Sequence, residues 1–153
     1  MPTVPTSFKE EYKKVERYCA FQEKCAFDVH RKLRDMEVPR TESEQIILVL
    51  TEKGFIDHDR YCDAFVNDHI KIKRWGRQKI KASLKAKLLP AISIDRALNK
   101  IEFSILSENL TYLMNRKIKE LAGEKDPQKQ KAKLIRYLAS CGYEIPMILD
   151  FID

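Results

Sequence analysis

The residues best suited to bind another molecule are basic side chains gathered in one window of the chain. Residues 69–94 contain eight lysines and arginines and no acidic residue, whereas residues 1–68 contain 11 basic and 14 acidic side chains. The eight are Lys71, Lys73, Arg74, Arg77, Lys79, Lys81, Lys85 and Lys87. Because the whole chain carries a net charge of only +6, this window supplies more than the entire excess. Such a concentrated positive field attracts a phosphate backbone or an acidic protein surface.

Three of these side chains have the spacing of one helix face. Arg77, Lys81 and Lys85 recur every fourth residue, and like charges at that spacing destabilise a helix by a few tenths of a kcal/mol per pair. No acidic residue within the segment offsets the repulsion. One interpretation is a solvated face whose lysines meet carboxylates of neighbouring segments. We favour the other, in which a polyanion or an acidic partner lies opposite.

Residue patterns typical of enzymes are absent. The sequence has no Gly-rich phosphate loop, no G-x-S-x-G and no H-E-x-x-H. The nearest metal-like pattern is His58-x-x-x-Cys62, which lacks the further ligands that zinc requires. The other cysteines, Cys19, Cys25 and Cys141, form no C-x-x-C pair, and we expect all four to be reduced thiols. We therefore expect no enzyme, no catalytic residue, no cofactor and no metal.

The elements that position the basic window are predicted to be helices. The chain has only four glycines and is rich in good helix formers, which favours helices joined by short connections. Apolar pairs four residues apart recur at intervals of about 50 residues, which suggests a repeated unit. These pairs are Val29 with Leu33, Ile80 with Leu84, and Leu134 with Leu138.

The full pattern predicts an all-α fold, a tandem array of three three-helix (helix-turn-helix-like) repeats with an elongated or curved shape. We place the repeats at residues 1–56, 57–104 and 105–153, with the basic window in the second. Neighbouring repeats should pack together, because one unit of this size is small for an independent core. We expect the protein to be a monomer.

Helix starts are predicted from capping residues. Ser7–Glu10 and Thr41–Glu44 have the spacing of capping boxes, and Ser93 precedes an apolar stripe. Asp57 is expected to cap a helix, as is Asp126, which is followed by a proline.

The helix that starts after Asp57 is expected to carry Ile72 and to end near Trp75 and Gly76. We expect Trp75 to be a core anchor between two helices, although an indole could also stack on a base. The following helix, residues 77–87, should bury Leu88 in line with Ile80 and Leu84.

Membrane association is not expected. No apolar run approaches the roughly 20 residues needed to cross a bilayer. Residues 1–11 lack the apolar stretch of a signal peptide. We therefore expect a cytoplasmic protein.

Over residues 50–87 the chain resembles the RecX family. The resemblance rests on Gly54-Phe55-Ile56-Asp57-His58-Asp59-Arg60-Tyr61-Cys62, on Lys73-Arg74-Trp75-Gly76-Arg77 and on Arg77-x-x-Ile80-x-x-x-Leu84-x-x-Lys87. The chain departs from the family pattern at His58, where an acid is usual, and at Cys62, where alanine is usual. After Lys87 the family commonly has a Lys-Gly turn, whereas here we expect a longer turn that contains Pro90.

The resemblance implies a regulator that binds filaments of the RecA recombinase on DNA and inhibits strand exchange and ATP hydrolysis. The eight basic side chains would then contact filament DNA or an acidic RecA surface, and substitution of Arg77 and Lys81 by glutamate should weaken binding. Binding to single- and double-stranded DNA should be weak and salt-dependent. With about five phosphates engaged, the log-log salt slope on single strands would be roughly −3.5.

Two other functions fit the residues. One is a helix-turn-helix regulator that binds duplex DNA without RecA and uses residues 77–87 as its recognition helix. Its candidates for base contacts are Arg77 and Gln78, because lysines mainly contact phosphates. The other is a helical scaffold whose basic face binds an acidic protein.

Overall fold

The regular structure of the chain is entirely helical. The structure is a computed structural model that describes residues 1–153. A short 3-10 turn at Thr6–Phe8 precedes nine helices. The helices are α1 (Lys9–Phe21), α2 (Ala26–Asp35), α3 (Arg40–Glu52), α4 (His58–Lys71), α5 (Arg77–Ala86), α6 (Ala91–Asn99), α7 (Phe103–Glu120), α8 (Pro127–Ser140) and α9 (Ile145–Ile152).

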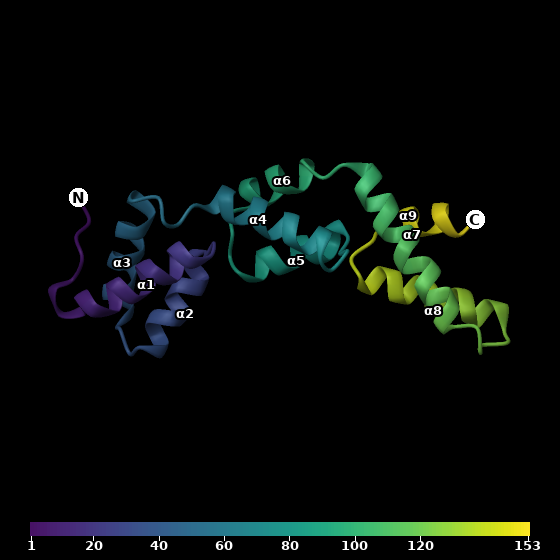
Figure 1. The fold of residues 1–153 in the computed structure, drawn as a ribbon, viewed down its shortest axis with the longest axis horizontal. Helices are drawn as coiled ribbons and strands as arrows, with labels where there is room; N and C mark the ends of the chain where they lie inside the picture. The colour runs from purple at the N-terminus through teal and green to yellow at the C-terminus, as the bar shows by residue number, and fades with distance from the viewer.

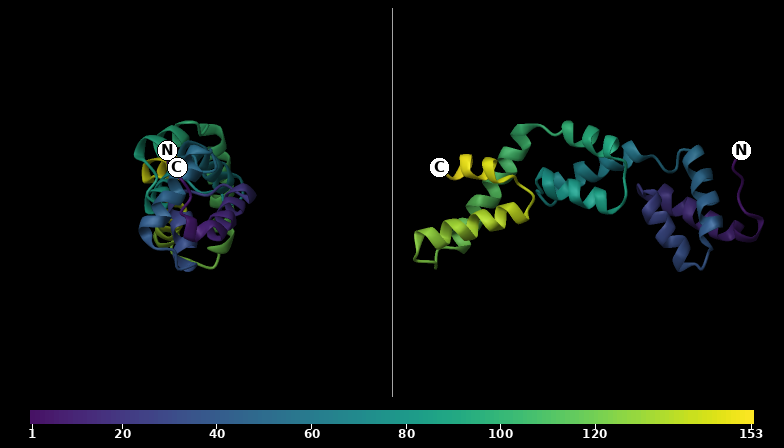
Figure 2. Two further views of the ribbon diagram at one scale, coloured as in Figure 1. Left: turned by 90° about the vertical axis from the view of Figure 1, so that its left-hand side faces the viewer. Right: turned by 180° about the vertical axis from the view of Figure 1, so that it is seen from behind.

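The helices form three groups of three along one long axis (Figure 1). The first group, α1–α3, lies at one end, α4–α6 in the middle and α7–α9 at the other end, so that the two termini lie far apart. Both the view from behind and the narrow end-on view agree with this elongated shape (Figure 2). The predicted array of three-helix repeats is therefore confirmed. The limits at residues 56 and 104 stay a prediction. Helix α7 begins at Phe103, so its first two residues lie before the second limit.

One turn recurs between the second and third helix of every repeat. Each turn contains a residue with positive φ: Glu37 (62°), Leu88 (62°) and Gly142 (103°). The next residue is buried and donates its N–H to a carbonyl five residues earlier: Val38 to Leu33 at 3.0 Å, Leu89 to Leu84 at 3.3 Å, and Tyr143 to Leu138 at 3.3 Å. This closure satisfies carbonyls at the helix end. All three apolar pairs that predicted the repeat are also buried.

The turn after α5 corrects the expectation for Leu88. The helix ends at Ala86, so Leu88 leaves the apolar stripe and is 79% exposed, while Leu89 is buried in its place. The connection from α5 to α6 spans residues 87–90 and contains Pro90, and it has the same length as residues 36–39 between α2 and α3. That it is longer than the turn usual in the family stays a prediction. Leu88 stands in the left-handed conformation that glycine adopts without strain.

Some predicted helix starts were also wrong. Helix α1 is preceded by Phe8, with no side-chain cap, so the first capping box does not form. Prolines replace the other two expected caps: Pro39 precedes α3 and Pro90 precedes α6. Ser93 is instead buried inside α6. The predicted caps at Asp57 and Asp126 are confirmed, because their side chains accept the N–H groups of Arg60 and Gln128.

Two apolar cores hold the three repeats. The first contains ten buried residues, all from the first repeat. The second contains nineteen and runs without interruption through the second and third repeats. Cys25 is the one buried residue of the first repeat that belongs to this larger core. The second and third repeats therefore share a core, and the first repeat has its own.

The helices are amphipathic. The longest, α7, has 18 residues and buries only Leu106, Leu110 and Leu113. No helix of the structure combines the length and the apolar character that a membrane crossing needs.

Candidate functional site

The connection between α4 and α5 carries two of the predicted basic residues, Lys73 and Arg74. Helix α4 ends at Lys71, several residues earlier than expected, and Ile72 is 75% exposed rather than packed. The chain reverses at Arg74, whose φ is 55°. This reversal lets the N–H of Trp75 donate to the carbonyl of His69 at 3.2 Å, which returns the indole to the side of α4.

Trp75 lies at the end of a row of aromatic rings that begins on α4. The centroids of Phe65 and His69 are 3.8 Å apart, and those of His69 and Trp75 are 4.6 Å apart. Trp75 is partly buried against the larger core, which confirms its expected role as an anchor. Two predicted cations meet over its ring, with Lys73 Nζ 5.1 Å and Lys79 Nζ 4.5 Å from the centroid. Both lie within the range of a cation–π interaction.

The close packing of the backbone at position 76 explains why glycine follows Trp75. Its N–H donates to the carbonyl of Cys141 at 2.8 Å, and the N–H of Gln78 donates to the carbonyl of Gly142 at 3.0 Å. A Cβ atom on Gly76 would lie 2.7 Å from the backbone nitrogen of Tyr143. The start of α5 therefore docks backbone to backbone against the turn between α8 and α9.

Two of the predicted arginines also contact the third repeat or the chain leading into it. The guanidinium carbon of Arg74 lies 3.7 Å from the ring centroid of Tyr112. Arg77 donates to the carbonyl of Ile101 at 3.2 Å. The hydroxyl of Tyr143 donates to the carbonyl of Arg74 at 2.7 Å, and burial raises the pKa of this phenol well above its usual range. Part of the predicted positive surface therefore also joins the repeats.

Three further lysines of the predicted set differ in whether a carboxylate pairs with them. Lys81 Nζ lies 4.0 Å from Asp95 of α6, a weak ion pair between two exposed groups. Lys85 and Lys71 are exposed and form no ion pair. Only one lysine of the predicted stripe is therefore offset by a carboxylate of its own repeat.

Lys87 faces the first repeat. Its Nζ donates to Asp28 Oδ1 at 3.0 Å and to the Tyr61 hydroxyl at 2.9 Å. Burial lowers the pKa of Lys87, but these two hydrogen bonds outweigh it, and the pKa lies above its ordinary value. Burial also raises the pKa of Tyr61 to about 12. Of the eight predicted contact residues, Lys87 is thus the one whose charge is most fully used inside the protein.

The eight residues do not form one patch. Lys73 and Lys79 lie over the ring of Trp75, and Arg74 lies over that of Tyr112. Arg77 and Lys81 contact neighbouring elements, and Lys87 is bonded to Asp28. Lys71 and Lys85 are exposed. No comparison of residues tests their role, and it stays a prediction.

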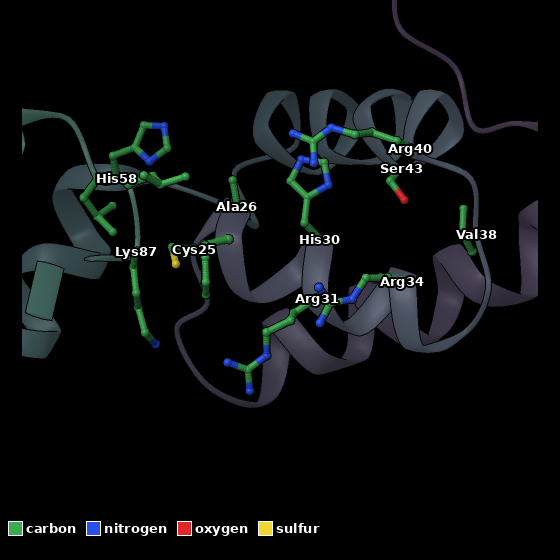
Figure 3. Close-up of a pocket in the computed structure, with 13 residues that line it drawn as sticks. Cys25, Ala26, His30, Arg31, Arg34, Val38, Arg40, Ser43, His58 and Lys87 are labelled. Carbon is green, nitrogen blue, oxygen red and sulfur yellow. The ribbon is translucent and has the colours of Figure 1, made fainter. Parts of the chain in front are cut away.

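A basic cavity between the first and second repeats was missed by the sequence reasoning. It has a volume of about 480 Å³ and is lined by α2, α3 and the turn after α5 (Figure 3). His30, Arg31 and Arg34 of α2 line it together with Arg40 of α3. The signal in the sequence was the run from His30 to Arg34, which was hidden when charge was summed over residues 1–68.

The histidines and cysteines are dispersed. Cys62 is buried, which raises the pKa of its thiol to about 11, whereas His58 is exposed. All four cysteines are free thiols. The structure contains no group of three or more histidine, cysteine, aspartate or glutamate residues placed to hold a metal ion.

Known proteins share both the sequence and the fold. Residues 57–98 match the family model described as RecX, second three-helix domain. The regulatory protein RecX of Clostridium tetani is 34% identical over 116 residues, which are 75% of this chain and 53% of the relative. That of Clostridium botulinum (strain Alaska E43) is 35% identical over 104 residues, which are 67% of this chain and 48% of the relative. The chain belongs to the RecX family.

Solved structures of RecX proteins have the same fold. A crystal structure of regulatory protein RecX aligns with a TM-score of 0.82 at 22% identity, covering 92% of this chain and 70% of the other. RecX from Lactobacillus salivarius aligns with a TM-score of 0.78 at 19% identity, covering 95% of this chain and 96% of the other. This RecX-family chain spans about half the length of the curated relatives it matches, and those relatives are named as regulatory proteins.

Proposed function

We propose that this chain is a non-enzymatic regulator that binds filaments of the RecA recombinase on DNA. By binding, it inhibits the recombinase and ATPase activities of RecA and so modulates DNA repair, recombination and the SOS response. The observation that carries this proposal is the set of cations at the end of α4, around Trp75 and along α5. Four of them, Lys71, Lys73, Lys79 and Lys85, have no carboxylate partner within the protein. Membership of a family of regulatory proteins supports the same conclusion.

Shape supports a filament as the target. An elongated body of three repeats offers contacts spread along its length, as a helical groove requires (Figure 1). Lysines contact phosphates without reading bases, which suits a protein that binds filaments whatever the sequence of their DNA. We place the first contacts at the four unpaired lysines, with Arg74, Arg77, Lys81 and Lys87 as the outer part of the same surface.

The helix-turn-helix alternative has less support. A recognition helix reads bases with residues near its N-terminus. In this chain the side chain of Gln78 donates to Glu144 at 3.2 Å, and Arg77 donates to the carbonyl of Ile101. Both candidates for base contacts are therefore engaged with the third repeat or the segment before it.

The test is ATP hydrolysis by RecA on single-stranded DNA, titrated with this protein well below one copy per RecA. The test variant combines Lys73→Glu with Lys79→Glu. The control variant combines Lys125→Glu with Lys129→Glu, because both of these lysines are exposed and belong to the third repeat. The first should raise the concentration needed for inhibition by about tenfold or more, equivalent to about 1.4 kcal/mol. The control should leave inhibition unchanged.

Salt gives a second readout. Each phosphate contact that is lost should reduce the slope of log affinity against log salt by about 0.7 on single strands. A folded Lys73/Lys79 variant that still inhibits fully would contradict the proposed site. A wild-type protein without any effect on RecA, but with a sequence-selective footprint on duplex DNA, would favour the alternative.

A further inference from the structure

The basic cavity beside α2 lies on a different part of the molecule from the cations around Trp75. It is walled by α2 and α3 of the first repeat and by the turn between α5 and α6 of the second (Figure 3). Its volume of about 480 Å³ is in the range of pockets that hold small ligands or a few side chains. None of the residues that line it is acidic.

Apart from Lys87, which is bonded to Asp28, the cations of this cavity have little internal compensation. Arg31 and Arg34 form no ion pair. Arg40 pairs with Glu44 at 3.3 Å, but both side chains are more than half exposed, and such a pair is weak. Burial lowers the pKa of His30, and the positive charge of Arg40 lowers it further. An anionic ligand could therefore bind several guanidinium groups without displacing a strongly bound carboxylate of the protein.

The other half of the cavity is apolar. Phe27 and Leu89 line it, together with Val38. Leu88 stands at its rim with 79% of its surface exposed, because the left-handed turn directs it away from the core. Contiguous apolar surface bordered by charged side chains is the arrangement found where proteins bind amphipathic partners.

We propose that this cavity binds an acidic peptide segment of a partner protein. Carboxylates of the segment would face Arg34 and Arg40, and one apolar side chain would lie against Leu88 and Phe27. A sugar–phosphate backbone would satisfy the arginines but would leave the apolar wall uncovered, so a peptide fits both halves better. Because the segment would touch two repeats, its binding would also hold the first repeat against the second. This proposal goes beyond the regulation of RecA and does not depend on it.

The experiment measures binding of a fluorescent peptide of alternating glutamate and leucine to the full chain by anisotropy, without RecA or DNA. The test variant combines Arg34→Glu with Arg40→Glu, and the matched control combines Lys13→Glu with Arg17→Glu. The control residues are exposed on α1 and line no part of the cavity. We expect the test variant to weaken binding by about tenfold or more, about 1.4 kcal/mol, and the control to retain it.

A second variant tests the apolar half. Leu88→Asn keeps a residue that tolerates positive φ while removing the apolar surface, so it should fold and bind the peptide more weakly. A peptide of alternating glutamate and serine should likewise bind more weakly to the wild type. Equal binding of both peptides, or equal loss in the test and control variants, would overturn the proposal. The proposal would also be overturned if neither peptide bound and oligothymidylate bound to the wild type but not to the variant with Arg34→Glu and Arg40→Glu.

Discussion

The two junctions between repeats are built from different contacts. At the junction of the second and third repeats, the larger apolar core is continuous and the backbones meet. Gly76 and Gly142 allow this approach, with hydrogen bonds of 2.8 and 3.0 Å between the start of α5 and the turn after α8. Arg74 adds a side-chain contact with Tyr112.

The junction of the first and second repeats relies on charged side chains. Lys87 bridges Asp28 and Tyr61, and Arg60 donates to Glu23 at 2.5 Å. Cys25 is the only buried residue of the first repeat that joins the larger core. The contacts at this junction are therefore mostly polar and partly exposed to solvent.

The same turn shows the difference at a single position. Gly142 is required where the second and third repeats pack, because a Cβ atom there would lie 2.6 Å from Cβ of Lys79. Leu88 occupies the equivalent position of the second repeat, where its side chain extends into solvent. Close packing thus selects glycine at one turn, and open space permits leucine at the other. We infer that the second and third repeats move as one body and that the first is the more easily displaced.

The largest predicted effect comes from Gly76→Ala. The added methyl group would collide with the backbone around Gly142 and force the repeats apart. We expect a loss of about 2–3 kcal/mol in the free energy of unfolding. Urea denaturation checks this, with Gly123→Ala as the control, because nothing lies within 4 Å of a Cβ atom there. Equal stability of the two variants would contradict the backbone docking.

A smaller effect is expected from Lys87→Met. The variant leaves Asp28 and Tyr61 without their shared donor, which should cost about 1–2 kcal/mol. Hydrogen exchange should increase at the contact of the first and second repeats while α7 and α8 stay protected. Lys85→Met is the control, because Lys85 is exposed and forms no ion pair. A Lys87 variant as stable as the control would remove the basis of the polar junction.

The polar junction should also respond to pH. Burial raises the pKa of Asp28, but hydrogen bonds from Lys87 and from the N–H of Cys25 lower it by more, so the folded pKa lies below the unfolded value. The stabilising contribution is therefore complete above the unfolded pKa of about 3.9 and is lost as the pH falls through the folded pKa. A urea-denaturation series should show the gap between wild type and Lys87→Met closing in acid. A gap that stays constant down to the lowest pH would argue against Asp28 as the partner.

The smallest effect is expected from Leu88→Gly. Relief of the left-handed strain is worth about 1–2 kcal/mol, and the greater freedom of glycine in the unfolded chain offsets about 0.5–1 of it. Because Leu88 is exposed, little packing is lost, and we expect a net gain of about 0.5 kcal/mol. Thermal unfolding with a matched Leu88→Ala variant measures this. Glycine no more stable than alanine would show that the turn is not strained.

The sequence predicted the repeats better than their ends. Apolar pairs such as Ile80 and Leu84 mark a buried helix face through local spacing alone, and all three pairs are buried. Capping signals are less specific, because many serines and threonines occupy other positions. Thus Ser93 lies inside α6, and Pro90 precedes the helix.

The roles of the basic residues depended on partners that are distant in the sequence. Nothing near Lys87 in the chain indicates that Asp28 accepts its hydrogen bond 59 residues away. The cavity was missed for a similar reason. Arg34 and Arg40 are flanked by acidic residues in the sequence, and only the fold brings the two arginines to one cavity that no acidic side chain lines.

The contrast between the junctions has a mechanical consequence. Force applied to the two ends would load the junctions in series, because the termini lie at opposite ends of the body (Figure 1). The contacts of Lys87 and Arg60 can break one at a time, whereas the shared core and the glycine docking must yield together. Extension of the molecule should therefore begin as a small step at the first junction, well before the other two repeats part.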